Sequence, residues 1–168
     1  KAGTRLKVID EETLLVRERQ NLFSSSEFKA GLFEVQDINS QKIVKYLQPE
    51  PGQTFIDACA GAGGKTLHAA SLMDNKGTIL ALDIHDWKLR DLRKRARRAG
   101  VQNVEVRPIS SGKVIKRLKK RADRLLLDVP CSGLGVLRRN PDAKWKLDQG
   151  FIDRLRKIQT EILSTYPN

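Results

Sequence analysis

The sequence is poor in the residues that hold metal ions and disulfides. Its 168 residues include two cysteines and two histidines, and Cys59 and Cys131 do not show the paired spacing of a zinc motif or a disulfide framework. His68 and His85 have no ligand-like neighbours, which argues against a metal site and against a histidine-based catalytic triad. We therefore expect a protein without metal in a reducing cytoplasm.

Long apolar runs are also missing. No stretch approaches the roughly 20 apolar residues of a membrane span, and residues 1–5 lead into no signal-peptide core. We expect no contact with membranes. The chain starts at Lys1 rather than at a methionine, so we expect it to begin inside a longer polypeptide.

Acidic residues are the minority among the charged ones. There are 20 aspartates and glutamates against 32 lysines and arginines, which gives a net charge of +12 and a pI near 10.0. Such a balance favours a polyanionic partner such as nucleic acid over an acidic small molecule. The alternative is an ordinary soluble surface with a basic bias.

Strand and helix signals alternate from Gln53 onward. Predicted strands cover 54–58, 78–83, 103–108 and 123–128, and predicted helices cover 65–74, 86–99, 112–120 and about 148–164. This order indicates an α/β fold, with a doubly wound, mostly parallel sheet covered by helices on both faces. Only residues 166–168 follow the last helix, so we expect further strands beyond them in the natural protein.

The first third of the chain predicts a small extension. Alternating apolar residues over 4–18 suggest a hairpin, and Asn39 or Ser40 could cap a helix that ends before Pro49. We expect residues 1–48 to pack, as an N-terminal β/α extension, on a catalytic domain that covers 49–168.

A glycine-rich turn follows the predicted strand 54–58 and opens the next helix. It fits neither common phosphate-binding motif, because Cys59 stands where a Walker loop needs glycine and Thr66 stands where a dinucleotide fingerprint needs one. Glycines at the carboxyl end of a strand let the backbone approach a ligand closely. The turn therefore suits a nucleoside cofactor without a pyrophosphate, and S-adenosylmethionine fits that description.

Asp83 closes the predicted strand 78–83, 20 residues after Gly63. A carboxylate at this place can accept hydrogen bonds from both ribose hydroxyls of a nucleoside. The alternative is that it caps the following helix, but Asp86 suits that role better. We expect Asp83 to bind ribose.

The segment Asp128-Val129-Pro130-Cys131 follows another apolar run, so its thiol stands at the same sheet edge. A thiol beside a methyl donor suits the methylation of cytosine. Carbon 5 of cytosine becomes nucleophilic enough only after a thiolate adds to carbon 6. A carboxyl group near N3 would stabilise the adduct, and a base must then remove the carbon 5 proton.

Basic residues gather in three segments. The helix at 86–99 and the segment 113–124 are typical of solvated faces, although either could contact RNA. The segment that follows the thiol mixes charge with an aromatic ring that could stack on a base. We expect substrate contact there from Arg138, Arg139, Lys144 and Trp145.

Taken together, residues 28–164 resemble the Sun/Fmu (Nol/Nop/Sun) family of RNA cytosine-C5 methyltransferases. The resemblance rests on Phe28 to Asp37, on Asp57 to Thr66, and on Asp128 to Gly133 with Arg138 to Trp145. It implies a Rossmann-like methyltransferase fold that lacks its last strands here. It implies contacts with S-adenosylmethionine from Cys59, Ala60, Gly61, Ala62, Gly63, Gly64, Lys65, Asp83 and Asp128. Ser110 stands where the family often has an acidic residue on the adenine side.

The resemblance also implies which thiol has which role in catalysis. In this family the nucleophile resembles a cysteine in a later Thr-Cys-Ser motif, which these 168 residues do not contain. It implies that Cys131 assists product release, whereas the chemistry of the residues alone would make Cys131 the nucleophile. We therefore predict a monomeric chain that binds the cofactor and RNA, ribosomal RNA in particular, without turning RNA over. The alternatives are a non-catalytic RNA-binding module and a small-molecule methyltransferase.

Overall fold

The computed structural model describes residues 6–18, 20–137 and 140–167. It divides the chain into two units, with the division between Glu34 and Val35. The sequence placed this boundary after residue 48. The helix α2 (Ile38–Leu47) instead lies in the second unit, because its buried Val44 packs in one cluster with Ala69 of α3 (Gly64–Leu72).

The first unit contains the predicted hairpin. Strands β1 (Leu6–Asp10) and β2 (Thr13–Val16) pair antiparallel, and a short 3-10 helix, η1 (Leu22–Ser24), follows them. The helix α1 (Ser26–Lys29) begins at Ser25, whose side chain accepts a hydrogen bond from the amide of Phe28.

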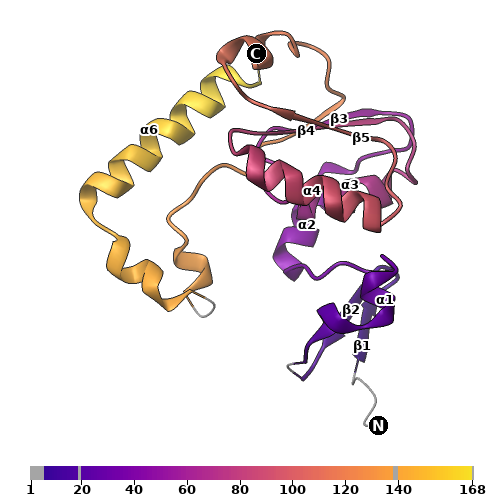
Figure 1. Cartoon of the computed structure of the whole chain (residues 1–168). Coiled ribbons are helices and arrows are strands. Elements are labelled where there is room, and N and C mark those ends of the chain that lie inside the picture. Colours follow the sequence, from indigo (N-terminus) through magenta and orange to yellow (C-terminus); the bar gives the residue numbers. More distant parts are fainter. Residues whose placement is uncertain (1–5, 19, 138–139, 168) are drawn as a thin grey trace. The chain divides into compact units, whose positions relative to one another are not determined.

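The second unit is built on a four-stranded sheet in which every pair of neighbouring strands is parallel (Figure 1). Its strands are β3 (Thr54–Asp57), β4 (Thr78–Asp83), β5 (Val104–Pro108) and β6 (Arg124–Leu126), in the order β5-β4-β3-β6. After β5 the chain returns past β4 and β3 to reach β6. The winding direction therefore reverses between β3 and β6, which confirms the doubly wound sheet and marks its switch point.

The remaining elements are α4 (Asp86–Arg98), α5 (Gly112–Lys116), η2 (Leu134–Val136), η3 (Pro141–Lys146) and α6 (Gln149–Thr165). Two predictions about helix ends were wrong. The cap of α2 is Asp37, because its Oδ1 accepts a hydrogen bond from the amide of Asn39 at 2.8 Å. The helix α5 ends at Lys116 rather than at residue 120, and Lys120 has a left-handed backbone with φ of 58°.

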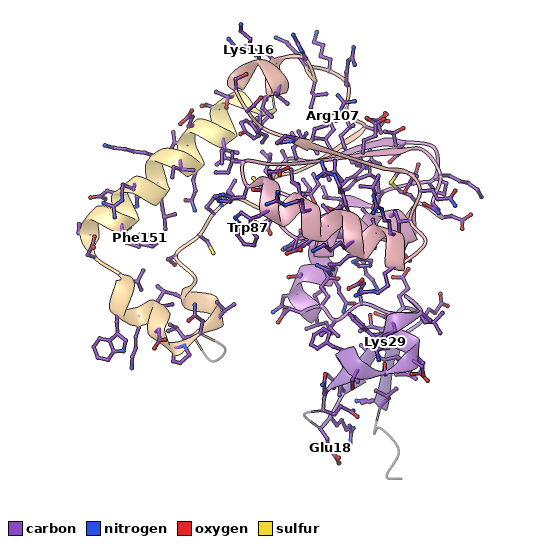
Figure 2. The ribbon with its side chains drawn as sticks, viewed as in Figure 1. Glu18, Lys29, Trp87, Arg107, Lys116 and Phe151 are labelled. Carbon is purple, nitrogen blue, oxygen red and sulfur yellow. The ribbon has the colours of Figure 1, made fainter. Side chains whose placement is uncertain are left out.

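Helices cover both faces of the sheet, as the alternation of elements predicted. Phe55 and Ile79 point to the face that α2 and α3 cover, while Ile56 and Leu80 point to the other face. The second face is covered by α5 and the turn after it (Figure 1). Lys116 of α5 projects away from the sheet (Figure 2).

The last helix, α6, differs from the helices that cover the sheet. None of the residues of α6 is buried, and its Gln159 donates a hydrogen bond to the backbone oxygen of Pro130 at 2.8 Å. Within the described part of the chain, no helix has the length and apolar character that a membrane crossing requires.

Candidate functional site

The glycine turn between β3 and α3 is held by close packing. Gly63 precedes the first helical residue with φ of 87°, and a Cβ added there would lie 2.4 Å from Cγ of Leu92. Arg95 of α4 donates a hydrogen bond to the backbone oxygen of Ala62 at 2.7 Å. The turn therefore lies against α4, and only glycine fits at position 63.

Asp83 organises this turn from the end of β4. Its Oδ2 accepts a hydrogen bond from the amide of Gly61 at 2.9 Å, and its Oδ1 accepts one from the amide of His85 at 2.8 Å. Each carboxylate oxygen keeps a second lone pair as a hydrogen-bond acceptor, and the residue is buried, with 7% exposure. Asp86 is the first helical residue of α4 rather than its cap, and it pairs with Arg90.

Asp57 at the end of β3 is a buried carboxyl group that was not among the predicted site residues. Its Oδ2 accepts a hydrogen bond from the hydroxyl of Thr66 at 2.7 Å. Its Oδ1 is buried without a hydrogen-bond partner among the described residues. Burial raises the pKa of Asp57 to about 6, against the lowering effect of the Thr66 hydroxyl. The sequence does carry a signal for Asp57 as a site residue, because an acidic residue is unusual at the end of an apolar strand.

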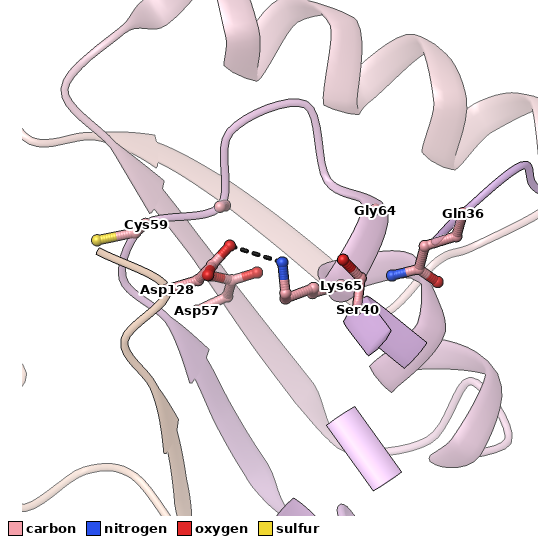
Figure 3. A pocket seen from close by; sticks show the side chains of 8 residues that line it. Gln36, Ser40, Asp57, Cys59, Gly64, Lys65 and Asp128 are labelled. Carbon is pink, nitrogen blue, oxygen red and sulfur yellow. Dashed lines mark hydrogen bonds and ion pairs between the residues drawn. The ribbon is translucent and has the colours of Figure 1, made fainter. Parts of the chain in front are cut away.

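Lys65 and Asp128 join the two sides of the switch point. The Nζ of Lys65, in the first turn of α3, lies 2.6 Å from Oδ2 of Asp128, in the segment after β6 (Figure 3). The side chain of Lys65 is 16% exposed and that of Asp128 48%. The sequence predicts both residues in the cofactor site, but it does not predict this ion pair.

A polar pocket of about 120 Å³ lies around this ion pair, at the carboxyl ends of β3 and β6 (Figure 3). Its lining consists of Gln36, Ser40, Asp57, Cys59, Ala60, Gly64, Lys65 and Asp128. The Nε2 of Gln36 is buried without a partner among the described residues, as is Oδ1 of Asp57. Two residues of the lining therefore each keep one polar atom unused, a donor on Gln36 and an acceptor on Asp57. Gln36 and Ser40 were not predicted as site residues, although Gln36 belongs to the family-like segment 28–37.

The two cysteines differ in their surroundings. Cys59 is half-buried and lines the pocket. Burial, together with the charges of nearby carboxylates, raises its pKa to about 12, so it is a protonated thiol at neutral pH. Cys131 is exposed in the segment after Asp128 and does not belong to the pocket lining.

Asp83, Ser110 and Trp145 lie outside the pocket lining. Ser110 is exposed, two residues after the end of β5. Trp145 is 80% exposed, and the Nζ of Lys144 lies 4.7 Å from the centroid of its ring. Arg138 and Arg139 fall outside the described residues. Among the residues that the structure describes, no group of three or more histidine, cysteine and acidic side chains could hold a metal ion.

Comparison with known proteins gives the family. The model of the family described as 16S rRNA methyltransferase RsmB/F matches residues 44–167. A Synechocystis protein named "Probable ribosomal RNA small subunit methyltransferase B" is 40% identical over 140 residues, which are 81% of this chain and 31% of that protein. The Caenorhabditis elegans "26S rRNA (cytosine-C(5))-methyltransferase nsun-1" is 34% identical over 140 residues, covering 83% of this chain and 21% of that protein.

Solved structures agree with this relationship. A methyltransferase homolog protein from Pyrococcus horikoshii is 34% identical, with a TM-score of 0.72 over 95% of this chain and 53% of that one. NSun6 from Pyrococcus horikoshii, solved with SFG, is 36% identical, with a TM-score of 0.65 over 70% of this chain and 30% of that one. The chain thus spans about a third of the length of the curated relatives from bacteria. It belongs to the RsmB/F family of 16S rRNA methyltransferases.

Proposed function

We propose that this chain forms the cofactor-binding part of an enzyme that methylates carbon 5 of cytosine in ribosomal RNA, with S-adenosylmethionine as the methyl donor. One observation carries the proposal. In a chain of this family, a polar pocket with an unused donor on Gln36 and an unused acceptor on Asp57 lies at the switch point of the sheet. Ligands of open α/β sheets bind at such points.

The residues of the pocket fit the amino-acid end of this cofactor. Its ammonium group requires acceptors, which Asp57 offers, and its carboxylate requires donors, which Gln36 and Lys65 offer. A pocket of about 120 Å³ has room for this end alone. Asp83, at the end of the neighbouring strand β4, would hold the ribose hydroxyls. The relative solved with SFG, an S-adenosylmethionine analogue, supports this choice of cofactor.

The cofactor would supply an electrophilic methyl group, and the residues of this chain would prepare its surroundings. Asp128, held by Lys65, would approach N3 of the target base. The Cys59 thiol is unsuited to nucleophilic attack because its pKa is raised to about 12. The exposed Cys131 would assist product release, as the family resemblance implies. Neither cysteine stands in a Thr-Cys-Ser motif, so we assign the attacking thiol to neither of them.

Calorimetry with S-adenosylmethionine tests the cofactor site. We expect the wild-type chain to bind, and Lys65→Met to bind about tenfold more weakly or worse, because a charged donor is lost. Lys94→Met is the matched control, since Lys94 also pairs with an aspartate, Asp91, but on the outer side of α4. Absence of binding by the wild type would favour the non-catalytic RNA-binding module.

A transfer assay tests the assignment of the thiols. Incubation of the chain with cofactor carrying a labelled methyl group and with cytosine-containing RNA should give no product. Robust transfer that Cys131→Ser abolishes would make Cys131 the nucleophile and would overturn the assignment. Cofactor binding combined with weak, salt-insensitive RNA affinity would instead favour a small-molecule methyltransferase.

A further inference from the structure

One group of basic side chains lies close together on a single short segment, and its members have no partners among the described residues. The segment that contains α5 and the turn after it carries six exposed cations, which we call the α5 patch: Lys113, Lys116, Arg117, Lys119, Lys120 and Arg121. Within the described residues, none of these six side chains takes part in a hydrogen bond or an ion pair. The next acidic residue, Asp123, already accepts a hydrogen bond from the amide of Thr54 at 2.7 Å.

The cations of α4 provide the contrast. Arg90 lies 3.4 Å from Asp86, and Lys94 lies 3.4 Å from Asp91. Arg95 is bound to the backbone oxygen of the glycine turn. Much of the charge of α4 is therefore used within the protein, whereas the charge of the α5 patch is directed to solvent. The sequence could not show this difference, because both segments are simply rich in lysine and arginine.

Buried side chains anchor the backbone of the α5 patch to the sheet. Ile115 and Leu118 are buried, with 8% and 9% exposure, and they pack against Ile56 and Leu82 on the second face of the sheet. The six cations on either side of these two anchors are exposed and point outward, as the labelled Lys116 does (Figure 2). Cations on an anchored backbone lose less conformational entropy when they bind a ligand.

The α5 patch runs across one face of the sheet. The segment leaves the carboxyl end of β5 and leads to the amino end of β6, so it crosses the sheet from the edge with the pocket to the opposite edge. No large apolar side chain is exposed in the described segment between Trp87 and Leu134. A membrane-binding surface would combine cations with such apolar side chains, whereas a surface that binds the phosphates of a nucleic acid does not need them. The α5 patch therefore suits a nucleic acid better than a membrane.

We propose that the α5 patch binds the phosphate backbone of the RNA substrate, at a place separate from the cofactor pocket. This inference rests on the proposed function, because it takes RNA as the partner. Contacts of this kind position the RNA without reading its sequence. The cations would hold the strand across the second face of the sheet while a base enters at the edge that carries Asp128.

The test compares two triple variants that lower the net charge equally. One is Lys116→Gln/Arg117→Gln/Lys119→Gln in the α5 patch, and the control is Arg90→Gln/Lys94→Gln/Arg97→Gln in α4. The probe is a fluorescein-labelled, cytosine-containing single-stranded RNA, followed by anisotropy at several salt concentrations. We expect the α5 variant to bind about tenfold more weakly or worse. Its slope of log affinity against log salt should be smaller by about 2, at roughly 0.7 per lost phosphate contact. The α4 variant should change much less.

The outcomes separate this inference from the proposed function. Equal losses in both variants would mean that net charge alone matters, which overturns the α5 patch but leaves RNA as the partner. Wild-type binding that is absent or insensitive to salt would overturn the patch together with the RNA partner. Tighter binding to phosphatidylserine vesicles than to RNA would assign the patch to a membrane and overturn the inference.

A second measurement needs no variant. Acetylation of surface lysines in the wild-type chain should slow at Lys116 and Lys119 when RNA is added, and should stay unchanged at Lys94. Equal protection of all three lysines, or none, would overturn the inference. Unchanged calorimetric affinity for S-adenosylmethionine in both triple variants would show that they are folded.

Discussion

At the scale of single residues, the buried carboxyl group of Asp57 is the least expected feature of the site. A carboxylate without full hydrogen bonding is costly inside a protein, so such groups keep their proton to higher pH. Asp57 accepts a hydrogen bond from Thr66, the backbone of Cys59 also favours its charged form, and its Oδ1 is buried without a partner among the described residues. We interpret this as a polar group kept for a ligand rather than for stability.

The pKa of Asp57 predicts a pH dependence of stability. It rises from 3.8 to about 6 on folding, so the folded chain holds a proton that the unfolded chain has lost between these pH values. The free energy of unfolding should therefore fall as pH rises from about 4 to about 6, by roughly 3 kcal/mol for this group. Asp57→Asn should remove this component. Urea denaturation at several pH values measures it, and parallel profiles of the two proteins would contradict it.

Two glycines of the turn allow a matched test of packing. Gly63 and Gly61 both have positive φ, but only at Gly63 would a Cβ meet Leu92, which is itself fully buried. We expect Gly63→Ala to lower the free energy of unfolding by about 3 kcal/mol, through backbone strain and overpacking. Gly61→Ala should cost about 1 kcal/mol, through strain alone. Equal shifts of the urea midpoint would contradict the close packing against α4.

At the scale of elements, α2 and α6 have similar caps but different packing. Asp37 caps α2, and Oδ1 of Asp148 accepts a hydrogen bond from the amide of Phe151 in α6 at 2.6 Å. The helix α2 buries Val44, whereas α6 buries none of its residues. Most helices in proteins depend on packing for their stability, so the two helices should respond differently to the loss of a cap.

Replacing each cap by alanine tests this difference. Asp37→Ala should lower the free energy of unfolding by about 1 kcal/mol and leave the native circular dichroism unchanged, because packing holds α2 in place. Asp148→Ala should reduce the helical signal under native conditions and leave the urea midpoint unchanged, because α6 can unwind alone. The reverse pattern would show that α6 is part of the cooperative core.

Local sequence signals were sufficient for most elements. The continuous apolar run from Ile79 to Leu82 located β4 at 78–83 without error, and the apolar stripe of Leu89 and Leu92 located α4. The errors occurred where the chain leaves regular structure. β6 ends at Leu126 rather than at residue 128, because its length depends on pairing with β3, which is not visible from β6 itself.

At the scale of the whole molecule, the net charge of +12 has opposite effects on stability and on binding. Repulsion among the cations destabilises the free chain, and salt screens it. We expect the free energy of unfolding by urea to rise on the order of 1 kcal/mol between about 50 mM and about 500 mM sodium chloride. RNA affinity should fall over the same range. A stability that decreases with salt would indicate that the internal ion pairs outweigh the repulsion.

The sequence by itself determined the order of strands and helices, the glycine turn and the residues at the strand ends, because these depend on neighbours along the chain. The tertiary structure decided which of these residues meet. Lys65 and Asp128 are 63 positions apart, and they form an ion pair only because the chain winds back to place β6 beside β3. For the same reason, Gln36 and Asp57 line one pocket only because distant segments pack together. Packing also decides that the cations of α4 have partners, whereas those of the α5 patch have none within the described part of the chain.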